Sequence, residues 1–251
     1  MTSSDSEIAR TLATQAGELL LQVRTRDFTD ATARKAAGDA ESHLFLLDRL
    51  AELRPDDAVL SEEGADDPVR LAADRVWIVD PLDGTREFSE LDRADWAVHV
   101  ALWERGELAA GAVALPAEGT TLSTVDVAET PSRSDGPMRL AVSRSRPPAL
   151  VTDLAAQLGA ELVAMGSAGV KAMSVVRGDT DAYVHGGGQY EWDSAAPVAV
   201  ALAAGLHASR LDGSPLRYNQ PDPYLPDLVV CRPEVAEQVL TTIARVQQDF
   251  Q

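Results

Sequence analysis

The chain is organised around residues 76–88, Val76-Trp77-Ile78-Val79-Asp80-Pro81-Leu82-Asp83-Gly84-Thr85-Arg86-Glu87-Phe88. The first four residues are apolar and partly β-branched, which is typical of a buried strand. Pro81 fixes its own φ angle, and Gly84 permits backbone conformations that other residues resist. We therefore expect a strand that runs into Asp80, followed by a tight turn that also holds the carboxylate of Asp83.

Two chemical interpretations of this turn remain open from its own residues. Asp, Pro and Gly are common in ordinary surface turns, so Asp80 and Asp83 also fit a solvent-exposed turn. Carboxylates held at the end of a rigid strand equally offer a hard divalent cation the oxygen ligands that it prefers. Gly84 and Thr85 follow directly, with backbone N–H groups and a hydroxyl for whatever the cation holds. Acidic residues elsewhere in the chain favour the second interpretation.

Length and composition indicate a globular protein. The chain has 251 residues, of which 45% are hydrophobic, and a formal net charge of −18. The apolar content argues against a disordered chain. The negative charge favours solubility and disfavours nucleic-acid backbones and anionic membrane surfaces as partners. An anionic substrate would need local cations to reverse this field, and bound metal ions would do so.

The sequence shows no feature of export or membrane insertion. Cys231 is the one cysteine, so no intramolecular disulfide can form, and it follows an apolar run. The N-terminus lacks a basic region followed by an apolar run. No apolar run approaches the roughly 20 residues of a transmembrane helix. We expect a cytoplasmic protein without a transmembrane segment.

The first half of the chain predicts helices followed by a β-meander. The expected elements are a helix over 5–24, a polar loop over 27–37, a helix that starts at Gly38-Asp39 and carries Leu44, Leu47, Leu50 and Leu53 on one face, a strand at 58–60, and meander strands at 96–103, 108–115 and 120–125. His99, on the first meander strand, is interpreted as a core or surface histidine.

The second half alternates strands with helices after a linker at 128–137, which predicts layered α/β structure. The expected strands are 139–142, 161–165, 182–185, 206–211 and 228–231, and the expected helices are 147–158, 170–176, 193–204 and 234–248. Gly186-Gly187-Gly188 is expected to break the chain. We divide the chain into an N-terminal α+β subdomain, 1–130, and a C-terminal α/β subdomain, 131–251.

Acidic residues stand at the ends of several expected elements. Glu62 follows the strand at 58–60, and Asp193 begins a helix in the second half. Each has an ordinary alternative role, in a solvated loop for Glu62 and as a helix N-cap for Asp193. Together with Asp80 and Asp83 they would hold two or three magnesium ions.

Three motifs occur in a fixed order along the chain: Glu62-Glu63, the run from Trp77 to Thr85, and Trp192-Asp193-x-Ala-Ala. Together they resemble the lithium-sensitive, magnesium-dependent phosphatase superfamily of inositol monophosphatase. The resemblance covers nearly the whole chain and implies a layered αβαβα sandwich of the inositol monophosphatase and fructose-1,6-bisphosphatase type. Within the superfamily, the second motif with Glu191-Trp192-Asp193 is most similar to the bacterial CysQ-type 3′(2′),5′-bisphosphate nucleotidases.

The resemblance also implies roles for individual residues. Magnesium would be held by Glu62, Asp80, Asp83, Asp193 and the carbonyl of Leu82, with Glu63 behind them. The catalytic residues would be Asp39, Thr85 and Glu62, with Asp39 pairing with Thr85 to orient the attacking water. The substrate would contact Leu82, Asp83, Gly84, Thr85, Arg86, Lys171, Tyr190 and Asp193. The chain departs from the family at Lys35-Ala36-Ala37-Gly38-Asp39, where Thr-x-x-Asp or Ser-x-x-Asp is usual, and at Pro197, where glycine is frequent.

The resemblance implies a magnesium-dependent phosphomonoesterase that removes the 3′-phosphate of adenosine 3′,5′-bisphosphate and of its sulfated relative. It also implies inhibition by lithium and allows a homodimer. Inositol monophosphate and fructose 1,6-bisphosphate are alternative substrates, and a non-catalytic nucleotide sensor or a structural β-meander module are alternatives from other classes. Candidate cations for a second phosphate are Arg144, Arg146, Lys171 and Arg217, and Tyr190 and Trp192 are candidates for a flat wall against adenine.

Overall fold

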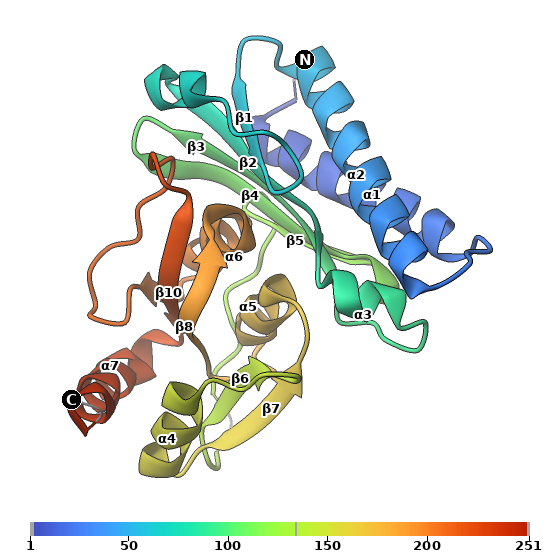
Figure 1. The fold of residues 1–251 in the computed structure, drawn as a ribbon. Coiled ribbons are helices and arrows are strands. Elements are labelled where there is room, and N and C mark those ends of the chain that lie inside the picture. Colours follow the sequence, from blue (N-terminus) through green and yellow to red (C-terminus); the bar gives the residue numbers. More distant parts are fainter. Residues whose placement is uncertain (1–2, 134, 250–251) are drawn as a thin grey trace.

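The computed structural model describes residues 3–133 and 135–249. It contains two five-stranded sheets, with helices between them and on their outer faces (Figure 1). The first sheet takes its strands from the first half of the chain, and the second sheet takes its strands from the second half. The layers therefore follow the order helix, sheet, helix, sheet, helix, which confirms the predicted αβαβα sandwich.

The strands of the first sheet follow one another in chain order from β1 to β5. They are β1 Ala58–Ser61, β2 Arg75–Asp83, β3 Ala97–Glu104, β4 Glu107–Leu115 and β5 Thr120–Ser123. β1 pairs with β2 in parallel, and the other pairs are antiparallel, so the predicted β-meander is confirmed. Side chains alternate along β2, so that Trp77 and Val79 pack toward one layer of helices while Ile78 packs toward the other.

Two long helices, α1 Asp5–Arg24 and α2 Ala31–Leu53, cover the outer face of the first sheet. Ser4 and Glu7 form a capping box at the start of α1, which satisfies backbone donors that the helix leaves free. Leu12 and Leu20 on the apolar face of α1 are fully buried. The predicted helix over residues 5–24 is therefore confirmed.

The start of α2 differs from the prediction. The expected loop over 27–37 is wrong, because the helix begins at Ala31 with the Asp30 side chain as its N-cap. Gly38 lies within the helix, where a Cβ atom would come within 2.7 Å of the Phe88 ring. Gly38 therefore allows Phe88 to pack directly against the backbone of α2. It does not mark the start of the helix.

The buried face of α2 also differs in part. Buried positions recur every four residues, at Gly38, Ser42, Leu46 and Leu50. Leu44, which was expected on the buried face, is 59% exposed. The prediction rested on leucines three residues apart. Because an α-helix has 3.6 residues per turn, residues four apart stay closer to one face of the helix than residues three apart.

The second sheet has the strand order β7-β6-β8-β10-β9. Its strands are β6 Arg139–Ser143, β7 Glu161–Met165, β8 Ala182–Tyr190, β9 His207–Ser209 and β10 Tyr224–Cys231. The long helices of this half are α4 Ala149–Leu158, α5 Ala168–Val176, α6 Glu191–Ala203 and α7 Pro233–Asp249, and the short helices of the chain are η1 Pro68–Ala72, α3 Thr85–Ser89 and η2 Pro116–Glu118.

Two details of the second sheet correct the prediction. Residues 186–188 do not break the chain, because β8 continues through them while paired with β10, with an irregular register between Leu225 and Asp227. The strand expected at 206–211 is shorter and spans His207–Ser209.

The central layer consists of α5 and α6, which contact both sheets, whereas α4 and α7 cover the outer face of the second sheet. One apolar cluster therefore includes Ile78 and Val113 of the first half with Val176, Ala196 and Val230 of the second. The division into two subdomains at residue 130 stays a prediction. Among the described residues, none of the helices is both long and apolar enough to cross a bilayer.

Candidate active site

The motif strand β2 continues further than its sequence suggests. It runs through Pro81 to Asp83, with a shift in its register against β3 between Asp80 and Asp83, so the predicted end of the strand at Asp80 is wrong. The chain turns only at Gly84, whose φ of +83° strongly favours glycine and which leads into α3. The irregular strand end brings the carboxylates of Asp80 and Asp83 to the same side of the sheet as α6.

Three carboxylates from distant parts of the chain converge at this point. Oxygen atoms of Asp80, Asp83 and Asp193 all lie within 4.8 Å of one another. Asp193 lies in the first turn of α6, where its Oδ2 accepts a hydrogen bond of 2.7 Å from the backbone N–H of Tyr190. The helix begins two residues earlier than predicted, and its N-cap residue is Tyr190, so the alternative role of Asp193 as the N-cap is wrong. Asp193 instead accepts from the backbone N–H of the N-cap residue and joins the cluster.

Glu62 approaches the same cluster because β1 and β2 are parallel neighbours. Its backbone N–H donates to the carbonyl of Val79 at 3.3 Å, directly before Asp80. Burial, together with repulsion from Asp83 and Glu63, raises the pKa of Glu62 to about 7, although an interaction with Asp80 opposes the rise. The strand pairing thus brings together the two acidic groups that the sequence places at strand ends.

Mutual repulsion disfavours the ionised form of the carboxylates in the cluster when no cation is bound. Burial and repulsion from Asp83 and Glu62 raise the pKa of Asp193 to about 7, and burial with repulsion from Glu62 and Asp83 also raises the pKa of Asp80. All the donor atoms are oxygens. A buried, oxygen-only and mutually repelling set is what a hard divalent cation such as Mg²⁺ stabilises.

Asp83 differs from its neighbours because hydrogen-bond donors surround it. Its Oδ2 accepts from the hydroxyl of Ser167 and from the backbone N–H of Gly169, and lies 3.2 Å from Nε2 of His99. Burial alone would raise the pKa of Asp83, but His99, Ser167 and Lys171 outweigh burial and lower it. Asp83 therefore remains ionised.

His99 is a site residue that the sequence analysis did not assign. It is completely buried, and its Nδ1 lies 3.1 Å from the carbonyl oxygen of Trp192. Burial alone would lower the pKa of His99, but Asp83 outweighs burial and raises it. The available clue was strand register, since His99 is paired with Asp80 and is a polar residue on an inward-facing, otherwise apolar strand face.

Asp39 lies inside α2 and faces the turn at Gly84. Burial and then repulsion from Glu63 raise the pKa of Asp39 to about 6, while the side chain of Thr85 partly opposes the rise. The hydroxyl of Thr85 lies 3.2 Å from the carbonyl oxygen of Leu82, to which it donates. Thr85 is therefore next to Asp39, with which the family resemblance pairs it, and next to the carbonyl of Leu82, which the resemblance makes a metal ligand.

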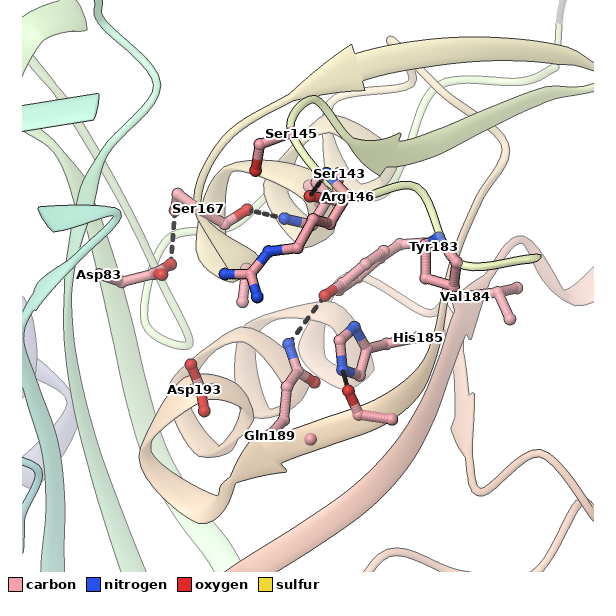
Figure 2. Close-up of a pocket in the computed structure, with 15 residues that line it drawn as sticks. Asp83, Ser143, Ser145, Arg146, Ser167, Tyr183, Val184, His185, Gln189 and Asp193 are labelled. Atoms are coloured by element: carbon pink, nitrogen blue, oxygen red, sulfur yellow. Dashed lines mark hydrogen bonds between the residues drawn. The ribbon is translucent and has the colours of Figure 1, made fainter. Parts of the chain in front are cut away.

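A cavity of about 440 Å³ opens from the carboxylates toward the second sheet (Figure 2). It is lined by Asp83, Ser143, Ser145, Arg146, Pro148, Ser167, Ala168, Lys171, Tyr183, Val184, His185, Gly187, Gly188, Gln189 and Asp193. Asp83 and Asp193 lie at one side of it, and Tyr183 and His185 lie along the opposite wall. Its walls come from both halves of the chain.

The predicted substrate cations lie in different places. Arg146 and Lys171 line the cavity, whereas Arg144 is paired with Glu87 and Glu90, and Arg217 is exposed outside it. The Lys171 ammonium donates to the carbonyl of Ser167 at 2.6 Å, and burial lowers its pKa.

Two other predicted substrate residues, Tyr190 and Arg86, are not among the residues that line the cavity. Tyr190 stacks on Trp192, with ring centroids 4.8 Å apart, and is not among the cavity-lining residues. Arg86 is exposed and pairs with Glu90 one turn further along the chain. Gly84 and Thr85 remain at the start of α3, beside the carboxylates. Contact of Tyr190 or Arg86 with a substrate stays a prediction.

Comparison with known proteins decides the family. The model of the inositol monophosphatase family matches residues 1–248. The chain belongs to the inositol monophosphatase family. This membership agrees with the five-layered fold and with the acidic motifs that converge on one cavity.

Relatives within the inositol monophosphatase family include nucleotide phosphatases. The chain is 54% identical to the 3′-phosphoadenosine 5′-phosphate phosphatase of Mycobacterium leprae, with 98% of this chain and 95% of the relative covered. It is 32% identical to the 3′(2′),5′-bisphosphate nucleotidase CysQ of Escherichia coli, over 85% of this chain and 94% of that protein.

Solved structures of the inositol monophosphatase family share the fold. CysQ from Bacteroides thetaiotaomicron superposes with a TM-score of 0.78 at 26% identity, covering 91% of this chain and 97% of that chain. An inositol monophosphatase from Thermotoga maritima superposes with a TM-score of 0.79 at 20% identity, covering 98% of both chains.

Proposed function

We propose that the chain is a magnesium-dependent phosphatase that hydrolyses the 3′-phosphate of adenosine 3′,5′-bisphosphate and of its sulfated relative. The observation that carries this proposal is the convergence of Asp80, Asp83 and Asp193 within 4.8 Å at the edge of a cavity of about 440 Å³. The cavity is within the size range of small-molecule sites. Relatives named 3′-phosphoadenosine 5′-phosphate phosphatase are 54–56% identical to this chain, which supports this substrate.

The acidic cluster would hold two or three Mg²⁺ ions through Glu62, Asp80, Asp83, Asp193 and the carbonyl of Leu82. When bound, such ions lower the pKa of water and relieve negative charge on the leaving oxygen of a phosphate ester. Ser167, Gly169 and His99 keep the Asp83 carboxylate ionised and fixed in direction, so that it meets a cation without reorganising.

The chain's own groups would orient water and phosphate. Asp39 would accept the hydroxyl proton of Thr85 as the Thr85 oxygen takes a proton from the attacking water, so that the proton is relayed to the Asp39 carboxylate. The backbone N–H groups of Gly84 and Thr85, with Arg86, would meet the phosphate oxygens. Arg146 and Lys171 supply positive charge to the cavity in a chain of net charge −18, which favours a substrate with a second anionic group.

A substrate panel tests the proposal directly. Phosphate release from adenosine 3′,5′-bisphosphate, inositol monophosphate and fructose 1,6-bisphosphate would be measured with and without Mg²⁺. We expect metal-dependent release that is fastest with the nucleotide. Equal or faster turnover of inositol monophosphate would overturn the substrate assignment, and nucleotide binding without any turnover would indicate a sensor.

A further inference from the structure

The wall of the cavity contains a buried amide with an unused polar atom. Gln189 is 5% exposed and Tyr183 is 2% exposed, and both line the cavity from β8. The Nε2 atom of Gln189 donates to the hydroxyl of Tyr183 at 2.8 Å. The Oε1 atom of Gln189 is buried and has no hydrogen-bond partner among the described residues. Buried polar atoms are nearly always hydrogen-bonded, so this oxygen is suited to a donor on a ligand.

Gln189 and Tyr183 together offer one acceptor and one donor. Because the Tyr183 oxygen already accepts from Gln189, its own proton is free to donate into the cavity. Burial and the nearby Asp193 and Asp83 raise the pKa of Tyr183, so the phenol keeps this proton at neutral pH. If the Gln189 amide is turned over, its oxygen accepts from the Tyr183 hydroxyl and its NH₂ group faces the cavity as the donor. The Tyr183 oxygen is then the acceptor, so the pair still offers one donor and one acceptor.

Such a pair matches a hydroxyl group and does not match a phosphate. A hydroxyl donates one hydrogen bond and accepts another, whereas ionised phosphate oxygens only accept. The acceptor atom of the pair would repel a phosphate. On the sugar of a nucleotide, the group that matches this point of the wall is therefore an alcohol, while on an adenine base the amine and a neighbouring ring nitrogen offer the same two functions.

The position of the pair indicates which alcohol. Gln189 directly precedes Tyr190, whose backbone N–H donates to Asp193 at 2.7 Å, and Figure 2 shows Gln189 on the side of the cavity that Asp193 also lines. The Tyr183 hydroxyl reaches the Gln189 amide from the opposite wall. Asp193 belongs to the cluster where the scissile phosphate would be held. The nearest hydroxyl of a nucleoside 3′-phosphate is the one on the adjacent ribose carbon, whereas the base amine lies at the far side of the sugar.

We propose that Gln189 and Tyr183 bind the 2′-hydroxyl of a ribonucleoside 3′,5′-bisphosphate, and so make the site select ribonucleotides over deoxyribonucleotides. This proposal rests on the proposed function of the chain and adds a specificity determinant to it. Neither residue takes part in the chemical step. Both would act on the discrimination between substrates.

The test compares adenosine 3′,5′-bisphosphate with 2′-deoxyadenosine 3′,5′-bisphosphate, in the wild type and in Gln189→Met. We expect the wild type to prefer the ribonucleotide by about 10- to 100-fold in kcat/KM, the loss typical of an unpaired buried polar group. In Gln189→Met the preference should fall to within about threefold, because mainly the ribonucleotide loses rate. Equal turnover of both nucleotides by the wild type, or an unchanged preference in the variant, would overturn the proposal.

Two control variants and one further nucleotide separate hydroxyl recognition from base recognition and from a folding defect. Tyr183→Phe should also reduce the preference, and it covers the case in which Gln189→Met does not fold. Gln157→Met, on the exposed surface of α4, makes the same chemical change outside the cavity and should leave the preference unaltered. Inosine 3′,5′-bisphosphate lacks the base amine, so a preference for adenosine over inosine that disappears in Gln189→Met would show base recognition and refute the proposal.

Binding measurements keep this inference distinct from the proposed function. Calorimetry with the two bisphosphates in the presence of Mg²⁺ or Ca²⁺ reports affinity whether or not the nucleotide is hydrolysed. Absence of hydrolysis with a retained ribonucleotide preference in binding would refute the phosphatase activity alone. Hydrolysis of both nucleotides with equal affinities would refute the role of Gln189 alone.

Discussion

Asp83 and Asp193 show how neighbouring groups give two buried carboxylates opposite properties. Ser167, Gly169 and His99 surround Asp83 with donors and positive charge, and its pKa is lowered. Asp193 has one backbone donor and faces other carboxylates, and its pKa is raised to about 7. Asp83 is thus ionised before a cation arrives, whereas Asp193 becomes fully ionised when a cation offsets the repulsion.

This contrast makes Asp83 the sharper single-residue test of the metal site. Asp83→Asn keeps the size of the side chain and removes its charge. We expect kcat/KM to fall by more than about 100-fold, since even residues behind metal ligands typically cost about 10- to 100-fold. Nucleotide binding should persist in calorimetry, and near-wild-type phosphate release by the variant would contradict the assignment.

Asp193 predicts a pH-dependent stability in metal-free protein. Its folded-state pKa of about 7 lies above the unfolded value of about 3.9, so its contribution to stability is present at low pH and is lost as the pH rises to about 7. The Asp193→Asn variant does not lose this stability as the pH rises, because asparagine does not ionise. In EDTA we expect the variant to be more stable than the wild type by about 1–3 kcal/mol at pH 8, and the difference should shrink toward pH 5.

Thermal melts across this pH range measure the effect. Titrating groups far from Asp193 are shared by both proteins and cancel in the difference. Asp80, whose pKa Asp193 raises, has a lower pKa in the variant, and this adds to the difference in the same direction. A stability difference that stays constant from pH 5 to pH 8 would show that burial and the acidic neighbours do not raise the pKa of Asp193. With Mg²⁺ present, the order should reverse, since only the wild type gains a full ligand set.

At the scale of the elements, contacts with neighbours decided where helices and strands begin and end. β8 continues through Gly186–Gly188 because β10 pairs with it on both sides of a register shift, at Gly186 and at Gln189. In α2, Gly38 lies under Phe88 and Leu82, so the two elements approach more closely than a side chain would allow. Helix propensity alone disfavours a glycine at such a position.

Gly38→Ala is therefore expected to destabilise the protein, although the same change normally stabilises a helix by about 1 kcal/mol. The new Cβ atom would lie 2.7 Å from the Phe88 ring, which is fully buried and has no room to move. Denaturant unfolding measures the change. Asp48→Ala, on the exposed side of the same helix, is the control and should be neutral or slightly stabilising; equal behaviour of the two variants would show that packing against Phe88 does not require the glycine.

At the scale of the whole molecule, a polar network joins the two halves beside the site. Arg70 of η1 donates to Oδ1 of Asn219 at 2.7 Å and to the carbonyl of Gln220 at 2.9 Å. Backbone N–H groups of the same two residues donate to Glu191 at 2.6 and 2.8 Å. Since Glu191 begins the helix that carries Asp193, the network helps to hold Asp193 opposite the β2 carboxylates.

We expect Arg70→Met to weaken metal binding as well as stability. The variant loses hydrogen bonds between the halves, each of which contributes about 0.5–3 kcal/mol. The increase in Tm on adding Mg²⁺ should be smaller than in the wild type, because Asp193 is no longer held opposite the carboxylates of β2. Calorimetric titration with Mg²⁺ provides a second measurement.

Arg232→Met is the matched control for this experiment. Arg232 is as buried as Arg70 and forms a buried ion pair with Asp181 in the second half, away from the acidic cluster. Breaking a buried pair typically costs about 3–5 kcal/mol, so stability should fall while Mg²⁺ affinity is retained. A similar loss of Mg²⁺ affinity in both variants would show that Arg70 acts only through general stability.

The sequence by itself determined the parts of this protein that depend on local order. The apolar run at 76–79, the turn residues of the meander and the alternation of strands and helices after residue 138 were sufficient for the layered fold. The positions of Glu62, Asp80, Asp83 and Asp193 predicted the acidic cluster, because each of these residues lies at or next to the end of an element whose direction is set locally.

Only the tertiary structure decided the features that depend on contacts between distant residues. The start of α2, the burial of His99 against Asp83 and the stacking of Tyr190 on Trp192 all follow from packing across sheets and helices. The pairing of Gln189 with Tyr183 depends likewise on the path of β8 through its glycines. Local propensities differ by about 1 kcal/mol or less per residue, and close packing and buried hydrogen bonds outweigh them.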